Sequence, residues 1–183
     1  MKYISLILCG IAFACPASAT PMDTAIIASM AYIGRSPSEV DVVFDSATKE
    51  GELDVLEKTV VQDGLSLLLT VTAEKNKIVR VSWLAKSHEN PRVWSELYWR
   101  ISSALMSRSF SPISRSTALD GQVVLGDKVT RPGTGASYWL SLLDPAEKAR
   151  VDMAYVVQAM RVKDFNITAS SAVAMPSPAA APL

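Results

Sequence analysis

Residues 56–84 have the sequence LEKTVVQDGLSLLLTVTAEKNKIVRVSWL, in which polar turns separate three apolar runs. The first turn contains Asp63-Gly64, a dipeptide that accepts the positive φ angles of a two-residue hairpin turn. The stretch therefore predicts a three-stranded antiparallel meander. Its first hairpin is expected to pair Val60 with Leu67 and Leu56 with Val71.

Alternation along the second strand defines the buried face of the meander. Leu67, Leu69 and Val71 share one face, because successive side chains of a strand point to opposite sides. An odd-length turn around Asn76 puts apolar residues of the third strand on the same face. The expected pairs are then Val79 with Ala73, Val81 with Val71 and Trp83 with Leu69. A two-residue turn would instead set Arg80 against Val71.

The first 19 residues have the pattern of a secretory signal peptide. Lys2 precedes an apolar run, and Ala17-Ser18-Ala19 is the small-x-small sequence that precedes a cleavage site. Lipid attachment at Cys15 is the alternative. The run is too short for a permanent span, which requires about 20 apolar residues. We therefore expect an exported protein, periplasmic if its host has two membranes, whose mature chain begins at Thr20.

Composition limits the kinds of functional site that the mature chain can contain. Both cysteines, Cys9 and Cys15, lie in the signal, so no thiol, disulfide or cysteine metal site is left. Once Lys2 is removed, acidic residues outnumber basic ones by one, which gives no electrostatic footprint for nucleic acid or an anionic membrane. The length suits one domain, residues 20–166, followed by a disordered Ala/Ser/Pro tail at 167–183.

Two short helices are expected before the meander. The first begins at Thr20-Pro21 and ends at Gly34, and the capping box Ser36-Pro37-Ser38-Glu39 opens the second, which continues through Phe44. Residues 46–52 are polar and predict a loop. Residues 34–40 distantly resemble the helix pair of small envelope-assembly lipoproteins.

Residues 92–108 predict the longest helix, and its apolar stripe is expected to cover the meander. Trp99 and Met106 fall nearly opposite that stripe. Two interpretations stay open: a chain terminus or loop covers the back of the helix, or Trp99 anchors a partner, since tryptophan is enriched among binding hot spots. The candidate binding residues are Trp99, Met106, Arg92, Trp94 and Tyr98.

Further strands are expected after this helix. Asp120-Gly121 predicts a second hairpin that returns through residues 123–125, and residues 138–143 form another strand-like run. Residues 145–163 fit either a helix or a return strand, and we choose the helix. The fold class is therefore α+β, in which an antiparallel sheet (meander 56–84 plus strands near 115–143) is covered on one face by helices.

Short motifs that suggest chemistry each have a simpler explanation. Ser46-Ala47-Thr48-Lys49 matches the S-x-x-K pattern of penicillin-binding proteins, but the accompanying elements are absent, so we interpret it as a solvated loop. His88, the only histidine, is interpreted as a surface or capping residue. Other candidates are a cation site at Asp41, Asp45 and Glu52 and an anion site at Gly133-Thr134-Gly135. We interpret these as a solvated helix face and a turn, and expect no catalytic residue, metal or cofactor.

The function expected from the sequence is non-enzymatic protein binding in the cell envelope, as an assembly or secretion factor or an immunity-type inhibitor. Trp99 and Met106 support it. So does Lys58 on the apolar face, which predicts that the first meander strand is an edge open to a partner strand. One alternative is a small-molecule carrier with a pocket lined by Trp83, Trp94 and Tyr98. The other is a small serine hydrolase that uses Ser46, Lys49 and His88.

Overall fold

A computed structural model describes residues 21–62, 64–85, 90–119, 122–123, 136–144, 149–158 and 161–171. The helical elements are α1 (Met22–Ser29), η1 (Met30–Tyr32), η2 (Pro37–Glu39) and α2 (Pro91–Met106), of which η1 and η2 are single 3-10 turns. The strands are β1 (Ser46–Glu50), β2 (Leu53–Gln62), β3 (Leu65–Glu74), β4 (Lys77–Ala85), β5 (Ser111–Leu119), β6 (Gln122–Val123), β7 (Ala136–Asp144), β8 (Ala149–Gln158) and β9 (Arg161–Ser171).

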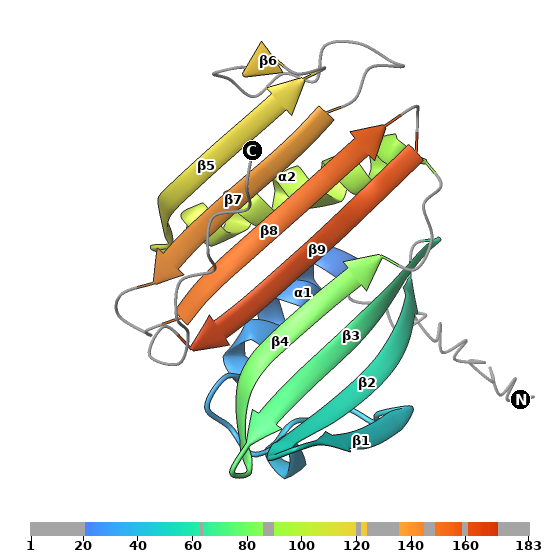
Figure 1. Cartoon of the computed structure of the whole chain (residues 1–183), viewed down its shortest axis with the longest axis vertical. Helices are drawn as coiled ribbons and strands as arrows, with labels where there is room; N and C mark the ends of the chain where they lie inside the picture. The colour runs from blue at the N-terminus through green and yellow to red at the C-terminus, as the bar shows by residue number, and fades with distance from the viewer. Residues whose placement is uncertain are drawn as a thin grey trace, which may run out of the picture.

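The strands within the described ranges form one antiparallel sheet, in the order β1-β2-β3-β4-β9-β8-β7-β5-β6. Both α-helices lie behind this sheet in Figure 1, on the same face. The antiparallel sheet is as expected. Sheet dominates the chain, however, and the two helices cover little of its face, so the α+β description fits only in part.

The predicted meander is β2, β3 and β4, and its first hairpin has the predicted register. The second turn, Lys75-Asn76, has two residues, both with positive φ. Even so, Val81 pairs with Val71 and Trp83 with Leu69. A β-bulge at Val79 explains this, because one extra residue shifts the following side chains to the other face. The predicted pair of Val79 with Ala73 is therefore wrong, and Ile78 takes its place.

The predicted core face of the meander is buried, but a different helix covers it. Leu67, Leu69, Val71, Val81 and Trp83 are all at most 4% exposed. The indole nitrogen of Trp83 donates a hydrogen bond to the Ser29 hydroxyl at 2.9 Å, which places the end of α1 over β4. Helix α2 contacts β8 and β9 instead. The expectation that α2 covers the meander is wrong, because α2 packs on strands that follow it in the chain.

The sheet consists of two halves with the same construction. In the first half α1 precedes the run β1-β2-β3-β4, and in the second α2 precedes β5-β7-β8-β9, with β6 as an addition. The last hairpins correspond residue by residue: both carry a bulge at the third residue of the final strand, at Val79 and at Lys163. By this correspondence Trp83 is equivalent to Ile167, and these two residues pair with each other between β4 and β9. A local two-fold axis therefore passes between them.

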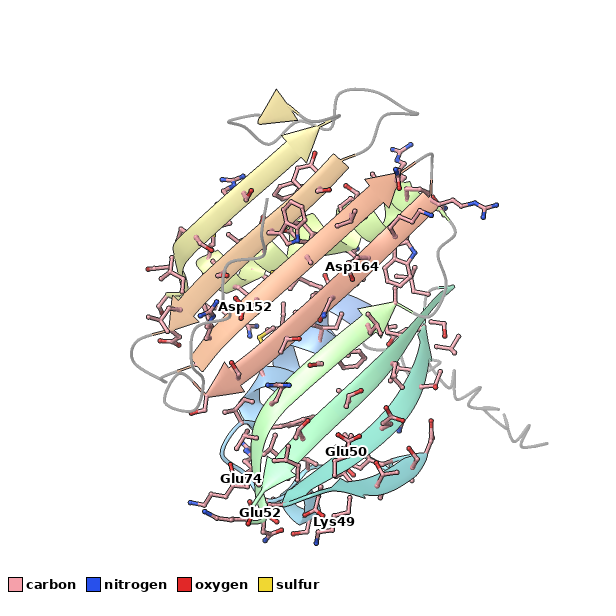
Figure 2. All side chains as sticks on the ribbon, in the orientation of Figure 1. Lys49, Glu50, Glu52, Glu74, Asp152 and Asp164 are labelled. Atoms are coloured by element: carbon pink, nitrogen blue, oxygen red, sulfur yellow. The ribbon has the colours of Figure 1, made fainter. Side chains whose placement is uncertain are left out.

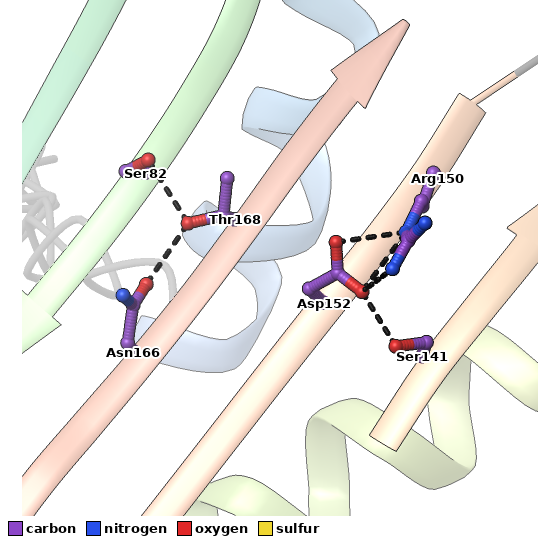
Figure 3. Close-up of polar contacts among 6 residues, drawn as sticks. All are labelled: Ser82, Ser141, Arg150, Asp152, Asn166 and Thr168. Atoms are coloured by element: carbon purple, nitrogen blue, oxygen red, sulfur yellow. Dashed lines mark hydrogen bonds and ion pairs between the residues drawn. The ribbon is translucent and has the colours of Figure 1, made fainter. Parts of the chain in front are cut away.

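The face of the sheet away from the helices carries polar side chains that bond across strands (Figure 3). The Ser82 and Thr168 hydroxyl oxygens lie 3.0 Å apart and join β4 to β9. On β8 the Asp152 carboxylate accepts hydrogen bonds from Ser141 of β7 and from Arg150. These contacts satisfy the polar groups of a face that the helices leave open.

Three predictions before the meander need correction. The first helix is shorter than predicted, since α1 ends at Ser29 and η1 follows. The capping box is present, with the Ser36 amide donating to the Glu39 carboxylate at 2.8 Å, but it opens only the turn η2, and residues 40–45 are not helical. Residues 46–50, predicted as part of a loop, form the edge strand β1. Strand β1 pairs with residues 53–57, so the prediction from Lys58 that the first meander strand is the edge of the sheet is also wrong.

Three predictions after α2 also change. Residues 149–158 form strand β8, so the helix predicted over 145–163 is wrong and the alternative of a return strand is confirmed. Strand β9 was not predicted, and it continues to Ser171, which moves the start of the tail beyond residue 167. The second hairpin is present, because Leu119 pairs with Gln122, but residues 120–121 and 124–125 lie outside the described ranges.

Candidate functional site

The best candidate site is a small cavity where α2, β5 and β7 meet. We call it the corner pocket. It has a volume of about 40 Å³, and its walls include Tyr98, Trp99 and Met106 of α2, Pro112 and Arg115 of β5, and Tyr138 of β7. Three of the five residues that the sequence nominated for binding thus line one cavity. Tyr138, Pro112 and Arg115 were missed, because they come from strands whose side chains no local pattern links to α2.

Aromatic rings build the inner wall of the corner pocket. The Trp99 ring lies edge-on to Tyr98 and to Tyr138, with ring centroids 5.1 Å and 5.4 Å away. Tyr138 stacks on Tyr155 at 6.1 Å. These are favourable distances for edge-to-face and offset-stacked rings. The packing holds the walls of the pocket in place.

The two stacked tyrosines differ in how their hydroxyl groups are satisfied. The Tyr155 hydroxyl donates a hydrogen bond to the Pro91 carbonyl oxygen at 2.7 Å, at the start of α2. The Tyr138 hydroxyl is buried and has no hydrogen-bond partner among the described residues. Tyr138 as a whole is only 2% exposed. A buried hydroxyl without a partner costs about 1–3 kcal/mol, so this one requires an explanation.

The electrostatics of the pocket favour neutral phenols beside one cation. Burial raises the pKa of Tyr98, and the nearby Arg115 guanidinium opposes part of that rise. Burial also raises the pKa of Tyr138. At neutral pH both hydroxyls therefore keep their protons and can donate hydrogen bonds.

The other sequence candidates on α2 lie elsewhere. Trp94 is fully buried, with its ring 4.8 Å from that of Phe165, so it belongs to the core. Arg92 is on the surface, where its Nε lies 3.0 Å from the Glu96 carboxylate. Trp99 does not face away from the sheet as a helical wheel suggests, because α2 lies near β7 and Tyr138 covers the flank of the helix. Met106 stays 43% exposed.

The motifs of the hydrolase alternative are not brought together. Ser46 and Lys49 lie on strand β1, where residues three apart point to opposite faces, whereas the S-x-x-K pattern needs a helical turn. The Ser46 hydroxyl instead donates to the Glu57 carboxylate at 3.3 Å, and Lys49 pairs with Asp54 at 3.7 Å. His88 lies outside the described residues.

The proposed ion sites also gain no support. Asp41 and Asp45 follow η2 in an irregular segment, not on a helix, and Asp45 accepts a hydrogen bond from the Thr59 amide at 2.7 Å. Figure 2 shows Glu52 at the turn that follows β1. Within the described ranges, no three acidic, histidine or cysteine side chains could hold a metal together. Gly133-Thr134-Gly135 lies outside them.

The pocket expected for a small-molecule carrier is filled by side chains. Trp83 is 4% exposed and bonds to Ser29, and Trp94 packs against Phe165. Of the three residues expected to line it, only Tyr98 reaches a cavity, the corner pocket.

A wider depression lies in the first half of the sheet, between β1 and η2, with a volume of about 340 Å³. Its walls include Lys49 and Asp54, which pair with each other, and Asn76. Charged side chains crowd this end of the sheet, where Figure 2 shows Lys49, Glu50 and Glu74 together. The depression is open and its charges are solvated, so it is the weaker candidate.

Comparison with known proteins found no match among family models, curated proteins or solved structures. In the part of the chain that the structure describes, no helix has the length and apolar character to cross a bilayer.

Proposed function

We propose that this protein is exported and binds another protein of the cell envelope without catalysing a reaction, as an assembly or secretion factor or an immunity-type inhibitor. The observation that carries the proposal is the apolar rim of the corner pocket. Met106 and Trp139 both line the pocket and are 43% and 44% exposed, and Ile113, the neighbour in sequence of the lining residue Pro112, is 51% exposed. Large apolar residues exposed together next to aromatic side chains are typical of protein-binding surfaces.

The outer edge of β5, the strand that supplies Pro112 and Arg115 to the corner pocket, supports the same function. Strand β6 pairs only with Ala118 and Leu119 of β5, and among the described residues no strand pairs with the outer side of 111–117. An incoming polypeptide can add a strand at such an edge. The bulge between Pro112 and Ser114 disrupts the near end of that edge, which limits unselective pairing.

Site-specific photocrosslinking in intact cells tests this proposal. A photoreactive residue replaces Met106 in one variant, Ile113 in a second and Val61 in a third. Val61 is a matched control, because it is apolar and 72% exposed but lies on β2. We expect one discrete crosslinked product from positions 106 and 113 and none from 61, and Ile113→Asp should abolish the product formed at 106.

The same product from all three positions, or none from any, would contradict the proposal. Export is checked separately by fractionation and by mass spectrometry of the mature N-terminus, which we expect at Thr20.

A further inference from the structure

Trp139 is an exposed aromatic residue on the face of the sheet away from the helices. Its neighbours along β7, Tyr138 and Leu140, are buried in the core, and successive side chains of a strand point to opposite faces. Its partners across the sheet are both small: Ser116 on β5 and Ala154 on β8. With small neighbours on either side, Trp139 remains 44% exposed.

The first half of the sheet has a charged residue at the equivalent position. The two-fold correspondence between the halves makes Trp139 the equivalent of Glu57, and each pairs with a serine of its outer neighbour, Ser116 or Ser46. Glu57 accepts a hydrogen bond from Ser46, an arrangement suited to a face that meets water. The sheet therefore does not require an aromatic residue here, and tryptophan is a frequent anchor of binding sites.

The chain that follows β9 can reach this tryptophan. Strand β9 ends at Ser171, which pairs with Ala149, and Trp139 pairs with Ala154, five residues further along β8. With a rise of about 3.4 Å per residue and a strand spacing of about 4.8 Å, Trp139 lies roughly 20 Å from Ser171, two strands across. In the polyproline II conformation, at about 3.1 Å per residue, the fifth residue after Ser171 reaches about 16 Å and the seventh about 22 Å. These two residues are Pro176 and Pro178.

The composition of this segment suits the surface that it would cross. Residues 172–183, which lie outside the described ranges and which we call the tail, have the sequence AVAMPSPAAAPL and carry no charged side chain. On the way to Trp139 lie Arg150, Asp152 and Ser141, which bond one another (Figure 3). An uncharged chain can therefore pass over them without leaving a buried charge unpaired. Proline-rich segments bind aromatic surfaces in this extended conformation.

We propose that the tail folds back across β8 and β7, so that Pro176-Ser177-Pro178 packs on the indole ring of Trp139. Attachment through only a few residues gives the tail an effective concentration of the order of millimolar, so a weak contact between proline and tryptophan is sufficient. The inference does not rest on the proposed function, but it adds a condition to it. Because Trp139 also lines the corner pocket, a partner that contacts Trp139 must first displace the tail.

NMR spectroscopy and limited proteolysis of the full chain test this inference. We expect nuclear Overhauser effects between the Trp139 indole protons and the ring protons of Pro176 or Pro178. Elastase, which cleaves after small residues, should cut the tail at least about fivefold faster in Trp139→Ala, because cleavage follows the population of the released tail. Trp139→Phe keeps an aromatic ring and should change the rate by less than about twofold.

Leu84→Ala is the matched control, because Leu84 is also apolar and 43% exposed but lies on β4, in the first half of the sheet. It should leave the cleavage rate of the tail unchanged. Thermal unfolding of each variant verifies that it is folded.

Three results would overturn the inference: no Overhauser effect between the tail and Trp139, equal cleavage of Trp139→Ala and the parent protein, or Overhauser effects that arise only between differently labelled molecules in a mixed sample. The last result would assign the site to the tail of a second copy. Crosslinking at Met106 and Ile113 separates the two proposals. A crosslinked product without the Overhauser effects removes only the docked tail, and the Overhauser effects without a product remove only protein binding.

Discussion

The stacked pair of Tyr138 and Tyr155 allows one chemical change to be made in two environments. Substitution by phenylalanine removes only the hydroxyl, so the ring stack at 6.1 Å is kept in both variants. Tyr155→Phe breaks the 2.7 Å hydrogen bond to Pro91, whereas Tyr138→Phe removes a hydroxyl that no described residue bonds. Of the two variants, only Tyr155→Phe should therefore lower the stability.

The magnitudes follow from the net value of one hydrogen bond. Tyr155→Phe should lower the free energy of unfolding by about 0.5–1.5 kcal/mol, the usual net contribution of such a bond. In a domain of this size each kcal/mol corresponds to a fall in Tm of roughly 2–4 °C. Tyr138→Phe should leave the stability unchanged or raise it by up to about 1–3 kcal/mol, since a buried hydroxyl without a partner carries that cost.

Urea unfolding followed by tryptophan fluorescence measures both changes, with calorimetry as a second readout. The difference in the free energy of unfolding between the two variants is more informative than either value alone, because both variants remove a phenol hydroxyl and the two positions are adjacent. If Tyr138→Phe destabilises the protein as much as Tyr155→Phe does, the Tyr138 hydroxyl has a partner in the folded protein. The assignment of that hydroxyl as buried without a hydrogen bond would then be wrong.

Three further predictions concern the packing of the core and the ionisation of a buried tyrosine. Trp83→Phe should destabilise the protein by about 2 kcal/mol in urea unfolding, because it removes the indole donor from the buried Ser29 hydroxyl; an unchanged midpoint would mean that α1 does not dock on β4. Burial, together with Tyr138, raises the pKa of Tyr155 to about 12, so between pH 10 and pH 12 ionisation of the unfolded phenol should lower the free energy of unfolding, with this one group contributing at most about 1.4 kcal/mol per pH unit. The raised pKa values of Tyr98 and Tyr138 act in the same direction. The fall should be smaller in Tyr155→Phe. Leu142→Ala, at a fully buried position, should cost about 2–5 kcal/mol in a urea midpoint series, whereas Val61→Ser, at a largely exposed one, should stay within about 0.5 kcal/mol.

The sequence predicted the meander well because turn chemistry and burial agree there. Asp63-Gly64 sets the register of the first hairpin, and that register is confirmed. In the second hairpin Val81 and Trp83 lie on the buried face as predicted, although the turn has two residues and not the odd number that was predicted. The bulge at Val79 restores the face that a two-residue turn would have inverted, and a bulge leaves no separate sign in a run of apolar residues.

The failure to predict three of the strands has physical causes. Strand β1 is fully exposed at the edge of the sheet, so it has no buried face and no alternation to detect. Strand β9 carries the bulge at Lys163, which breaks its alternation, and its end shares the Ala/Ser composition of the tail. Strand β8 has apolar residues on both faces, and a run of this kind also satisfies a helical period.

Of the candidate site, only the residues that α2 supplies could be predicted from the sequence. Trp99 and Met106 stand out because they interrupt the polar face of α2, and both line the corner pocket. Arg115 and Tyr138 reach the same pocket from β5 and β7, and their proximity depends on the order of strands in the sheet. That order depends on long-range pairing, which no window of sequence contains.

The position of β9 has a consequence for how the chain assembles. Among the described strands β9 comes last in the sequence, yet it lies between β4 and β8 at the middle of the sheet, so the two halves can join only after β9 has been synthesised. Until it arrives, β4 presents a bare row of amide and carbonyl groups, which invites aggregation with other nascent chains. A chain cut short before Arg161 should therefore fail to join the two halves of its sheet, and β4 would remain an edge at which other chains can pair.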